Sequence, residues 1–265
     1  MKLCDYGRVW EGQAFHPGVY PSIYGVGEGA AFFGLNKCVY MFHPNNELAM
    51  EKLMFMDDVV CDVAKWNYFD ILNENGGYRG LGYKADGGPD GVCREIETVG
   101  ALKQKYPNIT GVYHDDMQIL AKRYGCAPAD YIKIADLAHS VNPSFKLWTC
   151  VYAHELDEKL WRGYAPYIDV VNLWVWESKD LTRYDFFLEN CRAIFPNKPI
   201  NAGVYLRDYH RAAPVEMPLL KLQMEKILRC LQDGLIEGFS ILGAVLIDGQ
   251  TEQARWARDF IKAHS

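Results

Sequence analysis

The chain has 265 residues, of which 49% are hydrophobic, 14% aromatic and 23% charged, and its formal net charge is −6. This composition excludes a disordered or collagen-like chain, and the acidic balance argues against a nucleic-acid-binding protein. The length suits a single α/β barrel, which commonly takes about 250 residues.

Seven short apolar runs, rich in Val, Ile and aromatic residues, follow one another along the chain. Continuous apolarity of this kind is typical of strands that are buried on both faces. The predicted strands cover residues 37–42, 59–64, 109–113, 145–152, 169–176, 200–206 and 238–243. Their starts are about 33 residues apart on average, which is close to the length of one strand–helix unit.

Helical patterns fill the intervals between these runs, and prolines mark several of their ends. The predicted helices cover residues 47–56, 92–106, 128–141, 155–164, 180–195, 218–231 and 252–263. Strands that alternate with helices predict a parallel sheet covered by helices. Because no glycine-rich dinucleotide-binding turn is present, we favour an α/β fold of the (β/α)8 TIM-barrel type over an open doubly wound sheet.

The eighth strand is not visible, and we expect it within residues 18–24, within residues 244–248, or absent. No linker divides the chain, so we expect one barrel domain over residues 1–265, with residues 1–36 as an N-terminal covering segment. Residues 67–91 form a long connection with seven glycines. Long loops after barrel strands are often functional, but a loop that merely tolerates insertions has the same composition.

The eight cysteines stand singly, without a CxxC motif, and we expect reduced and mostly buried thiols rather than a zinc site or a disulfide framework. The first residues lack the apolar core of a signal peptide, and no apolar run is long enough to span a membrane. We therefore expect a cytoplasmic protein with no membrane partner. A chain whose leader had been removed would have the same sequence.

Polar and aromatic residues stand where the predicted strands end, which is where barrel enzymes hold their catalytic groups. Aromatic rings at these positions suit the apolar faces of sugar rings, and polar groups suit their hydroxyls. The candidate substrate-binding residues are His43, Lys65, Trp66, Tyr113, His114, Tyr152, Glu155, Trp174, Trp176, Tyr205, Arg207 and Asp208.

Two adjacent acids, Asp115 and Asp116, directly follow the third predicted strand in the segment GVYHDDM. Acids in such a place are costly unless they meet a substrate, a metal or a cation. The alternative is that one of them caps a short helix that begins at Met117. We expect one of the two to be catalytic, and the sequence does not favour either.

Glu177 stands beside Trp174 and Trp176 at the end of the fifth predicted strand. An apolar wall raises the pKa of a carboxyl group, as a general acid requires, although Glu177 could instead cap the following helix. Glycoside hydrolysis needs a pair of carboxyls, and we predict Glu177 as the acid and Asp115 or Asp116 as its ionised partner. Glu155, Asp208 and Asp248 are reserve carboxyls, and retaining and inverting mechanisms both remain open.

Three strand-end segments resemble those of bacterial glycoside-hydrolase-like (β/α)8 barrels, including poorly characterised gut-type members. They are GVYHDDM (111–117), VVNLWVWES (170–178) and NAGVYLRDY (201–209), and the resemblance covers residues 37–260. It applies to the superfamily as a whole and assigns no catalytic pair. It implies a barrel glycosidase with a carbohydrate substrate.

Two other functions compete with this one. A metal-dependent barrel isomerase or aldolase acting on a sugar would draw mixed ligands from the strand-end His, Asp and Glu residues, but no HxH or HExxH spacing supports it. A non-catalytic carbohydrate-binding barrel would keep the aromatic walls without the acid pair. We expect no metal and no cofactor, and the sequence indicates no particular sugar, linkage or oligomeric state.

Overall fold

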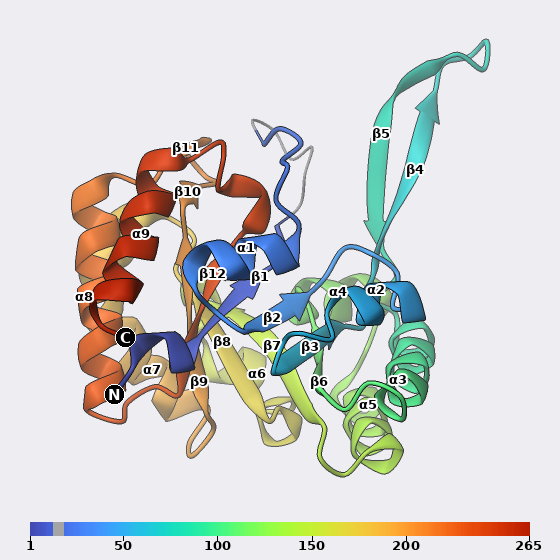
Figure 1. Ribbon diagram of the computed structural model, residues 1–265. Coiled ribbons are helices and arrows are strands. Elements are labelled where there is room, and N and C mark those ends of the chain that lie inside the picture. The colour runs from blue at the N-terminus through green and yellow to red at the C-terminus, as the bar shows by residue number, and fades with distance from the viewer. Residues whose placement is uncertain (13–18) are drawn as a thin grey trace.

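The computed structural model describes residues 1–12 and 19–265, and the side chains of residues 66–70 and 81–83 also lie outside the described part. Eight parallel strands close into a barrel with helices on its outside (Figure 1). In order around the barrel they are β1 (Gly7–Trp10), β12 (Gly238–Leu242), β9 (Ile200–Tyr205), β8 (Val170–Trp174), β7 (Lys146–Tyr152), β6 (Ile109–His114), β3 (Asp58–Asp62) and β2 (Lys37–Tyr40). The predicted (β/α)8 barrel is confirmed.

The strand missing from the seven predicted runs is β1. It lies within residues 1–36, and it pairs with β12 on one side and β2 on the other. Neither predicted position holds it, because residues 19–24 form no strand and the 3-10 helix η5 occupies Ala244–Leu246. Its apolar run is only Val9 and Trp10, because Arg8 precedes them and Glu11 follows, and such a short run is not recognised by its apolarity.

Helices cover the outer face of the barrel. In the described part they are α1 (Val26–Phe33), α2 (Glu47–Lys52), α3 (Pro89–Lys103), α4 (Met117–Tyr124), α5 (Pro128–Val141), α6 (Glu158–Trp161), α7 (Tyr184–Ile194), α8 (Met217–Gln232) and α9 (Thr251–Ala263). Prolines occupy the first turns of α3, α5 and α8, where their missing N–H has no helical partner to lose. Helix α5 has the predicted bounds, α4 is the short helix considered after Asp116, and α1 has no predicted counterpart.

The glycine-rich connection after β3 is a β-hairpin rather than an irregular loop. Strand β4 (Trp66–Leu72) pairs antiparallel with β5 (Tyr78–Ala85), and the hairpin projects away from the barrel (Figure 1). Oδ1 of Asn73 accepts a 2.8 Å hydrogen bond from the N–H of Gly77 and so closes the turn. Gly76 has a φ of 77°, a conformation that glycine adopts without strain.

A charged pair holds the amino-terminal end of the barrel. Arg8 of β1 donates hydrogen bonds of 3.2 and 3.1 Å to the two carboxylate oxygens of Asp58 on β3. The guanidinium lies 4.4 Å from the ring centroid of Trp148, and the hydroxyl of Thr110 donates to Asp58 at 2.6 Å. These contacts satisfy two groups that would otherwise be costly to bury.

All eight cysteines are free thiols, and six of them are buried, as predicted. The two ends of the chain meet beside α9, where the N–H of Leu3 donates to the carbonyl oxygen of His264 at 2.9 Å (Figure 1). Among the helices of the described part, none is both long and apolar enough to cross a membrane.

Candidate active site

Asp116 stands at the carboxyl end of β6 in a strained backbone conformation. Its φ of 45° and ψ of 36° lie in the left-handed region, which non-glycine residues rarely adopt. The N–H of Asp116 donates to Sγ of Cys150 on the neighbouring strand β7, at 3.1 Å. Strain of this kind persists where the surroundings impose it, and it is concentrated at functional sites.

The carboxyls of the Asp pair meet donors from β7. The hydroxyl of Tyr152 donates a 2.8 Å hydrogen bond to Oδ1 of Asp116. Sγ of Cys150 lies 3.6 Å from Oδ1 of Asp115 and 3.9 Å from Oδ1 of Asp116. Burial raises the pKa of Asp116, and the hydrogen bonds from Tyr152 and Cys150 only partly oppose that shift. Asp116 is therefore a half-buried carboxyl that is held in place by two side-chain donors.

Glu155 brings a second carboxyl to the same place. It ends the 3-10 helix η2 (Ala153–Glu155), which directly follows β7, and its Oε2 accepts a 3.3 Å hydrogen bond from the N–H of Tyr152. Burial raises the pKa of Glu155 to about 7, and the negative charge of Asp116 adds to the shift. A carboxyl with this pKa can both give and take a proton at neutral pH.

An aromatic wall lies next to these carboxyls, at the ends of β8 and β9. It consists of Trp174, Trp176, Tyr205 and Tyr209. The rings of Trp176 and Tyr209 are stacked with centroids 5.6 Å apart and planes 23° apart, and Tyr152 meets the edge of Trp176 at 5.7 Å. Trp174 and Tyr205 approach to 4.7 Å. Trp176 and Tyr209 are half-buried, so the wall presents aromatic surface to the mouth of the barrel.

The indole of Trp10 lies across the barrel beneath this wall. Its centroid is 5.6 Å from that of Trp174 and 6.1 Å from that of Tyr113. Trp10 is 7% exposed, and its Nε1 has no hydrogen-bond partner in the described part of the chain. An unpaired buried donor at this place suits an oxygen atom of a ligand.

The opposite side of the mouth carries a separate polar group. Glu11, directly after β1, is buried, and its Oε2 accepts hydrogen bonds from the N–H groups of Met41 at 2.8 Å and Phe42 at 3.1 Å. Its Oε1 lies 2.7 Å from Nδ1 of His43. Lys65 is buried nearby and donates to the carbonyl oxygen of Met41 at 2.5 Å.

The environment of Glu177 differs from the one predicted. Its Oε2 lies 2.5 Å from Nζ of Lys179 and 3.9 Å from Nε2 of His210. The hydrogen bond from Lys179 lowers the pKa of Glu177, and the charge of His210 adds to that effect. The predicted rise from the flanking indoles is therefore wrong, because the basic side chains of Lys179 and His210 reach Glu177 at the rim.

The structure removes His114 from the candidate site. Residues of a strand point alternately inward and outward, and Tyr113 takes the inward position. His114 is fully buried on the outer side, where its ring stacks on Tyr131 of α5 at 5.8 Å. Burial lowers the pKa of His114 to about 4, so the imidazole is neutral.

Four further candidates have other positions. Asp208, in the short strand β10 (Arg207–Asp208), accepts hydrogen bonds from the N–H and hydroxyl of Ser178 at 3.0 and 2.5 Å, and it thereby ties the ends of β8 and β9 together. Arg207 is buried beside it. Trp66 is the first residue of β4, and its side chain lies outside the described part. Asp248, a reserve, accepts from the N–H of Ile23 at 3.2 Å.

One group of side chains in the described part has the spacing of a metal site. A carboxylate oxygen of Asp115, one of Asp116 and Sγ of Cys150 all lie within 4.8 Å of one another. Cys150 was not among the predicted site residues, because a cysteine inside an apolar run is typical of the core. Glu11 and Trp10 were not among them either, because the predicted site residues were those that follow recognised strands and β1 was not recognised.

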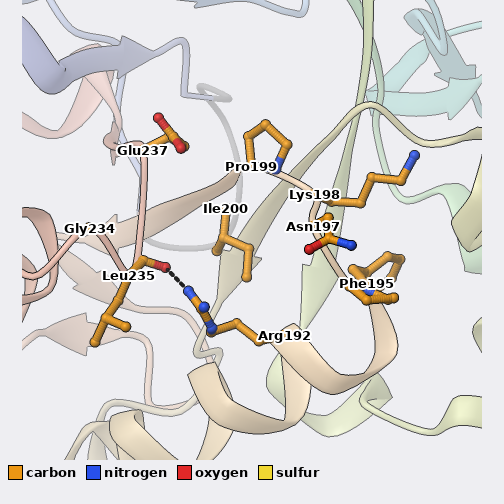
Figure 2. Close-up of a pocket in the computed structure, with 10 residues that line it drawn as sticks. Arg192, Phe195, Asn197, Lys198, Pro199, Ile200, Gly234, Leu235 and Glu237 are labelled. Carbon is orange, nitrogen blue, oxygen red and sulfur yellow. Dashed lines mark hydrogen bonds between the residues drawn. The ribbon is translucent and has the colours of Figure 1, made fainter.

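A hollow of about 370 Å³ lies at the other end of the barrel. Figure 2 shows it between the end of α7 and the residues that precede β9 and β12, with Arg192 donating to the carbonyl oxygen of Leu235 at 2.9 Å. Barrel enzymes carry their chemistry at the carboxyl ends of the strands. This hollow, at the amino ends of two strands, is therefore not the candidate active site.

No protein-family model matches the chain, and no curated protein matches its sequence. Solved structures share its fold. A β-glucuronidase of Bacteroides uniformis superposes with a TM-score of 0.57 at 13% identity over 93% of this chain, which spans 31% of that enzyme. The catalytic domain of a family GH18 chitinase from the fern Peteris ryukyuensis gives 0.54 at 11% identity, with 98% and 99% of the two chains covered.

A third structure, the xylanase-α-amylase inhibitor protein in complex with trehalose, gives a TM-score of 0.55 at 10% identity and covers 94% of this chain and 97% of that one. These identities show the fold alone. The barrel of this chain is the one found in glycoside hydrolases, and the same barrel is found in an inhibitor. The function must therefore be argued from the site.

Proposed function

We propose that the protein is a glycoside hydrolase whose carboxyl pair is Asp116 and Glu155. The observation that carries the proposal is that Tyr152 binds both carboxyls, through its hydroxyl and its backbone N–H, beside an aromatic wall. Glycosidic bond cleavage needs one carboxyl to protonate the leaving oxygen and a second to act on the other side of the sugar ring. Glu155 replaces Glu177 as the proposed acid.

The two carboxyls have different environments, which suits different roles. Asp116 receives a side-chain hydrogen bond from Tyr152 and lies beside Cys150, and both contacts lower its pKa against the rise that burial causes. Glu155 accepts a single hydrogen bond from a backbone N–H, and its pKa is about 7. We therefore assign the proton donor to Glu155 and the ionised role to Asp116.

The aromatic wall supports a carbohydrate as the substrate. Stacked rings such as Trp176 and Tyr209 offer flat apolar surface to a sugar ring, and the N–H of Trp10 offers a donor to one of its oxygens. Lys179 and His210 keep Glu177 ionised at the rim, where we propose that it binds substrate hydroxyls.

A panel of 4-nitrophenyl glycosides and of plant and mucin glycans tests the proposal. We expect the wild-type protein to hydrolyse at least one of them, and Asp116→Asn and Glu155→Gln each to lower kcat/KM at least 100-fold. Glu158→Gln, on the exposed surface of α6, and Asp136→Asn, on the exposed surface of α5, are the matched controls. Hydrolysis that survives both active-site substitutions would refute the pair, and binding without hydrolysis would indicate a carbohydrate-binding barrel.

A metal-dependent enzyme is the second candidate, and the spacing of Asp115, Asp116 and Cys150 favours it. Two carboxylates and a thiolate form a mixed oxygen and sulfur ligand set. Metal analysis of the purified protein separates the two candidates. A stoichiometric metal, with activity lost to a chelator and restored by that metal, would replace the two-carboxyl mechanism.

A further inference from the structure

The mouth of the barrel has two chemically different walls. In a closed ring of eight strands, the members four places apart face each other, so β1, β2 and β3 lie opposite β7, β8 and β9. The proposed carboxyls and the aromatic wall follow β6, β7, β8 and β9. The side chains that follow β1, β2 and β3 are Glu11, His43 and Lys65, and they form what we call the donor wall.

His43 is held in one orientation with one ring nitrogen left for a ligand. Its Nδ1 lies 2.7 Å from Oε1 of Glu11, and its ring stacks on Tyr40 with centroids 6.3 Å apart. Oε2 of Glu11 is already occupied by two backbone N–H groups. The hydrogen bond that Nδ1 of His43 donates to Glu11 raises the pKa of His43, which favours the doubly protonated ring, and Nε2 then presents an N–H at the exposed edge of the side chain.

Lys65 is buried, and no carboxylate among the described side chains forms an ion pair with it. It is 6% exposed, it donates to the carbonyl oxygen of Met41, and its Nζ lies 4.8 Å from the ring centroid of Tyr40. In the part of the chain that the structure describes, no carboxylate oxygen lies within 4.0 Å of it. Burial of an ammonium group is costly unless an anion compensates its charge. Of the three N–H bonds of Lys65, the contacts given above supply an acceptor for one and leave two without an acceptor.

Among the described residues, the other charged groups on this side form no ion pair with Lys65. Asp62 is fully buried, and burial raises its pKa to about 7, while the charge of Lys65 opposes that rise from a distance greater than that of an ion pair. Glu95 accepts a 2.9 Å hydrogen bond from Asn45. Lys52 is a further cation and pairs with Glu28 on the surface. Glu11 is the one carboxylate of the donor wall, and it already accepts hydrogen bonds from Met41 and Phe42 and contacts His43, so the wall has one carboxylate for two basic side chains.

We propose that the donor wall binds an anionic substituent on the sugar, a carboxylate or a sulfate ester, through Nε2 of His43 and Nζ of Lys65. This inference rests on the proposed function, since it names the class of glycoside that the same mouth accepts. An oxyanion offers acceptors to both cations at once, while the sugar ring lies between them and the carboxyls of the opposite wall. A neutral hydroxymethyl group would leave the Lys65 charge uncompensated.

The test compares acidic with neutral substrates. We would measure kcat/KM for 4-nitrophenyl glucuronide and galacturonide against the glucoside and galactoside, and for a 6-sulfated N-acetylglucosaminide against the unsulfated one. We expect the wild-type protein to prefer an acidic member, and Lys65→Met and His43→Gln each to lower the acidic-to-neutral ratio about tenfold or more. Preference for the uronides identifies the anion as a carboxylate, and preference for the sulfated sugar identifies it as a sulfate.

Two matched controls lie outside the mouth. Lys103→Met removes an ammonium that also donates to a backbone carbonyl, that of Pro107, and His139→Gln removes a ring that pairs with Asp169 at 2.7 Å. Neither is expected to change the ratio. Because Lys65 is buried, its variant can fail to fold, and His43→Gln, at a side chain that is 69% exposed, then carries the test.

Binding measurements separate failure of this inference from failure of the proposed function. Calorimetric titration with methyl glucuronide, methyl galacturonide, a sulfated methyl glycoside and their neutral counterparts requires no hydrolysis. Tighter binding of an acidic sugar that is lost in His43→Gln supports the donor wall even if no glycoside is cleaved. Equal binding or turnover of acidic and neutral sugars, or a ratio that both substitutions leave unchanged, overturns it.

Discussion

The hydroxyl of Tyr152 donates a 2.8 Å hydrogen bond to Oδ1 of Asp116. The backbone N–H of the same tyrosine donates to Glu155, so one residue of β7 connects two acidic side chains from different connecting segments. The negative charge of Asp116 also raises the pKa of Glu155. Two carboxyls that interact in this way titrate as a pair, so we expect both to contribute to the pH dependence of the proposed site.

The first prediction concerns that pH dependence. If Glu155 is the proton donor, it must be protonated, so kcat/KM should fall as the pH rises through about 7. A pH–rate profile of the wild-type protein on its best aryl glycoside measures this limb. In Glu155→Gln the residual activity should lose the limb, because glutamine does not titrate. A limb near pH 7 that persists in this variant would assign the donor to another group.

The second prediction compares Glu177 with Glu155. Lys179 and His210 keep Glu177 ionised, which is the wrong state for a general acid. Glu177→Gln should therefore lower kcat/KM less than tenfold, whereas Glu155→Gln should lower it at least 100-fold. Parallel kinetics of the two variants test this order, and the reverse order would restore Glu177 as the acid.

The third prediction concerns Tyr152→Phe. The hydrogen bond from Tyr152 lowers the pKa of Asp116, so its loss should raise that pKa above its already elevated value. A carboxyl that must be ionised then works only at higher pH, and the acid limb of kcat/KM should move upward with about a tenfold loss of activity. Tyr124→Phe, which removes a hydroxyl bonded to the carbonyl oxygen of Ala85 outside this pair, is the control. An unchanged acid limb would show that Asp116 does not titrate in the reaction.

Much of the fold follows from hydrophobic periodicity. Strands such as β3 and β8 are buried on both faces, and their continuous apolar runs made them visible. The hairpin was not visible, because Gly80 and Gly82 interrupt the alternation in β5 and the run after Trp66 resembles a loop. The four-residue strand β1 was not visible because its apolar run stops at Trp10, whereas the run of the equally short β2 continues through Met41 and Phe42.

The site was only partly predictable, because strand ends locate residues but do not orient them. The expectation that site residues follow the ends of strands selected Asp116, Tyr152 and Glu155, which stand at the carboxyl ends of β6 and β7 in the structure. It also selected His114, which the alternation along β6 turns toward α5. Glu177 was preferred to Glu155 because the flanking indoles were expected to raise its pKa. Lys179, two residues further along the chain, lowers the pKa of Glu177 instead.

The fourth prediction concerns the close contact between β9 and the aromatic wall. A Cβ at Gly203 would overlap the six-membered ring of Trp174. Gly203→Ala should therefore displace Trp174, lower the free energy of unfolding by about 1–3 kcal/mol and weaken substrate binding. At Gly80, on the projecting hairpin, no described atom lies within 4 Å of such a Cβ, so Gly80→Ala should be neutral. Urea unfolding and KM measure the two effects, and equal behaviour of both variants would contradict the prediction.

The fifth prediction concerns the charged pair at the amino-terminal end of the barrel. Arg8→Met leaves Asp58 largely buried without its partner, and should lower the free energy of unfolding by about 3 kcal/mol.

Burial alone would raise the pKa of Asp58, but the charge and hydrogen bonds of Arg8 bring it below its usual value. A carboxyl with a lowered folded-state pKa stabilises the fold fully above its unfolded pKa of about 3.9, and this stabilisation is lost as the pH falls through the folded value. The wild-type protein should therefore lose more stability than Arg8→Met between pH 5 and pH 3, as urea unfolding at each pH measures.

Lys133→Met, which breaks an exposed pair with Asp130, is the control and should change the free energy of unfolding by no more than about 0.5 kcal/mol. If Arg8→Met is no less stable than this control, the pair does not hold the end of the barrel.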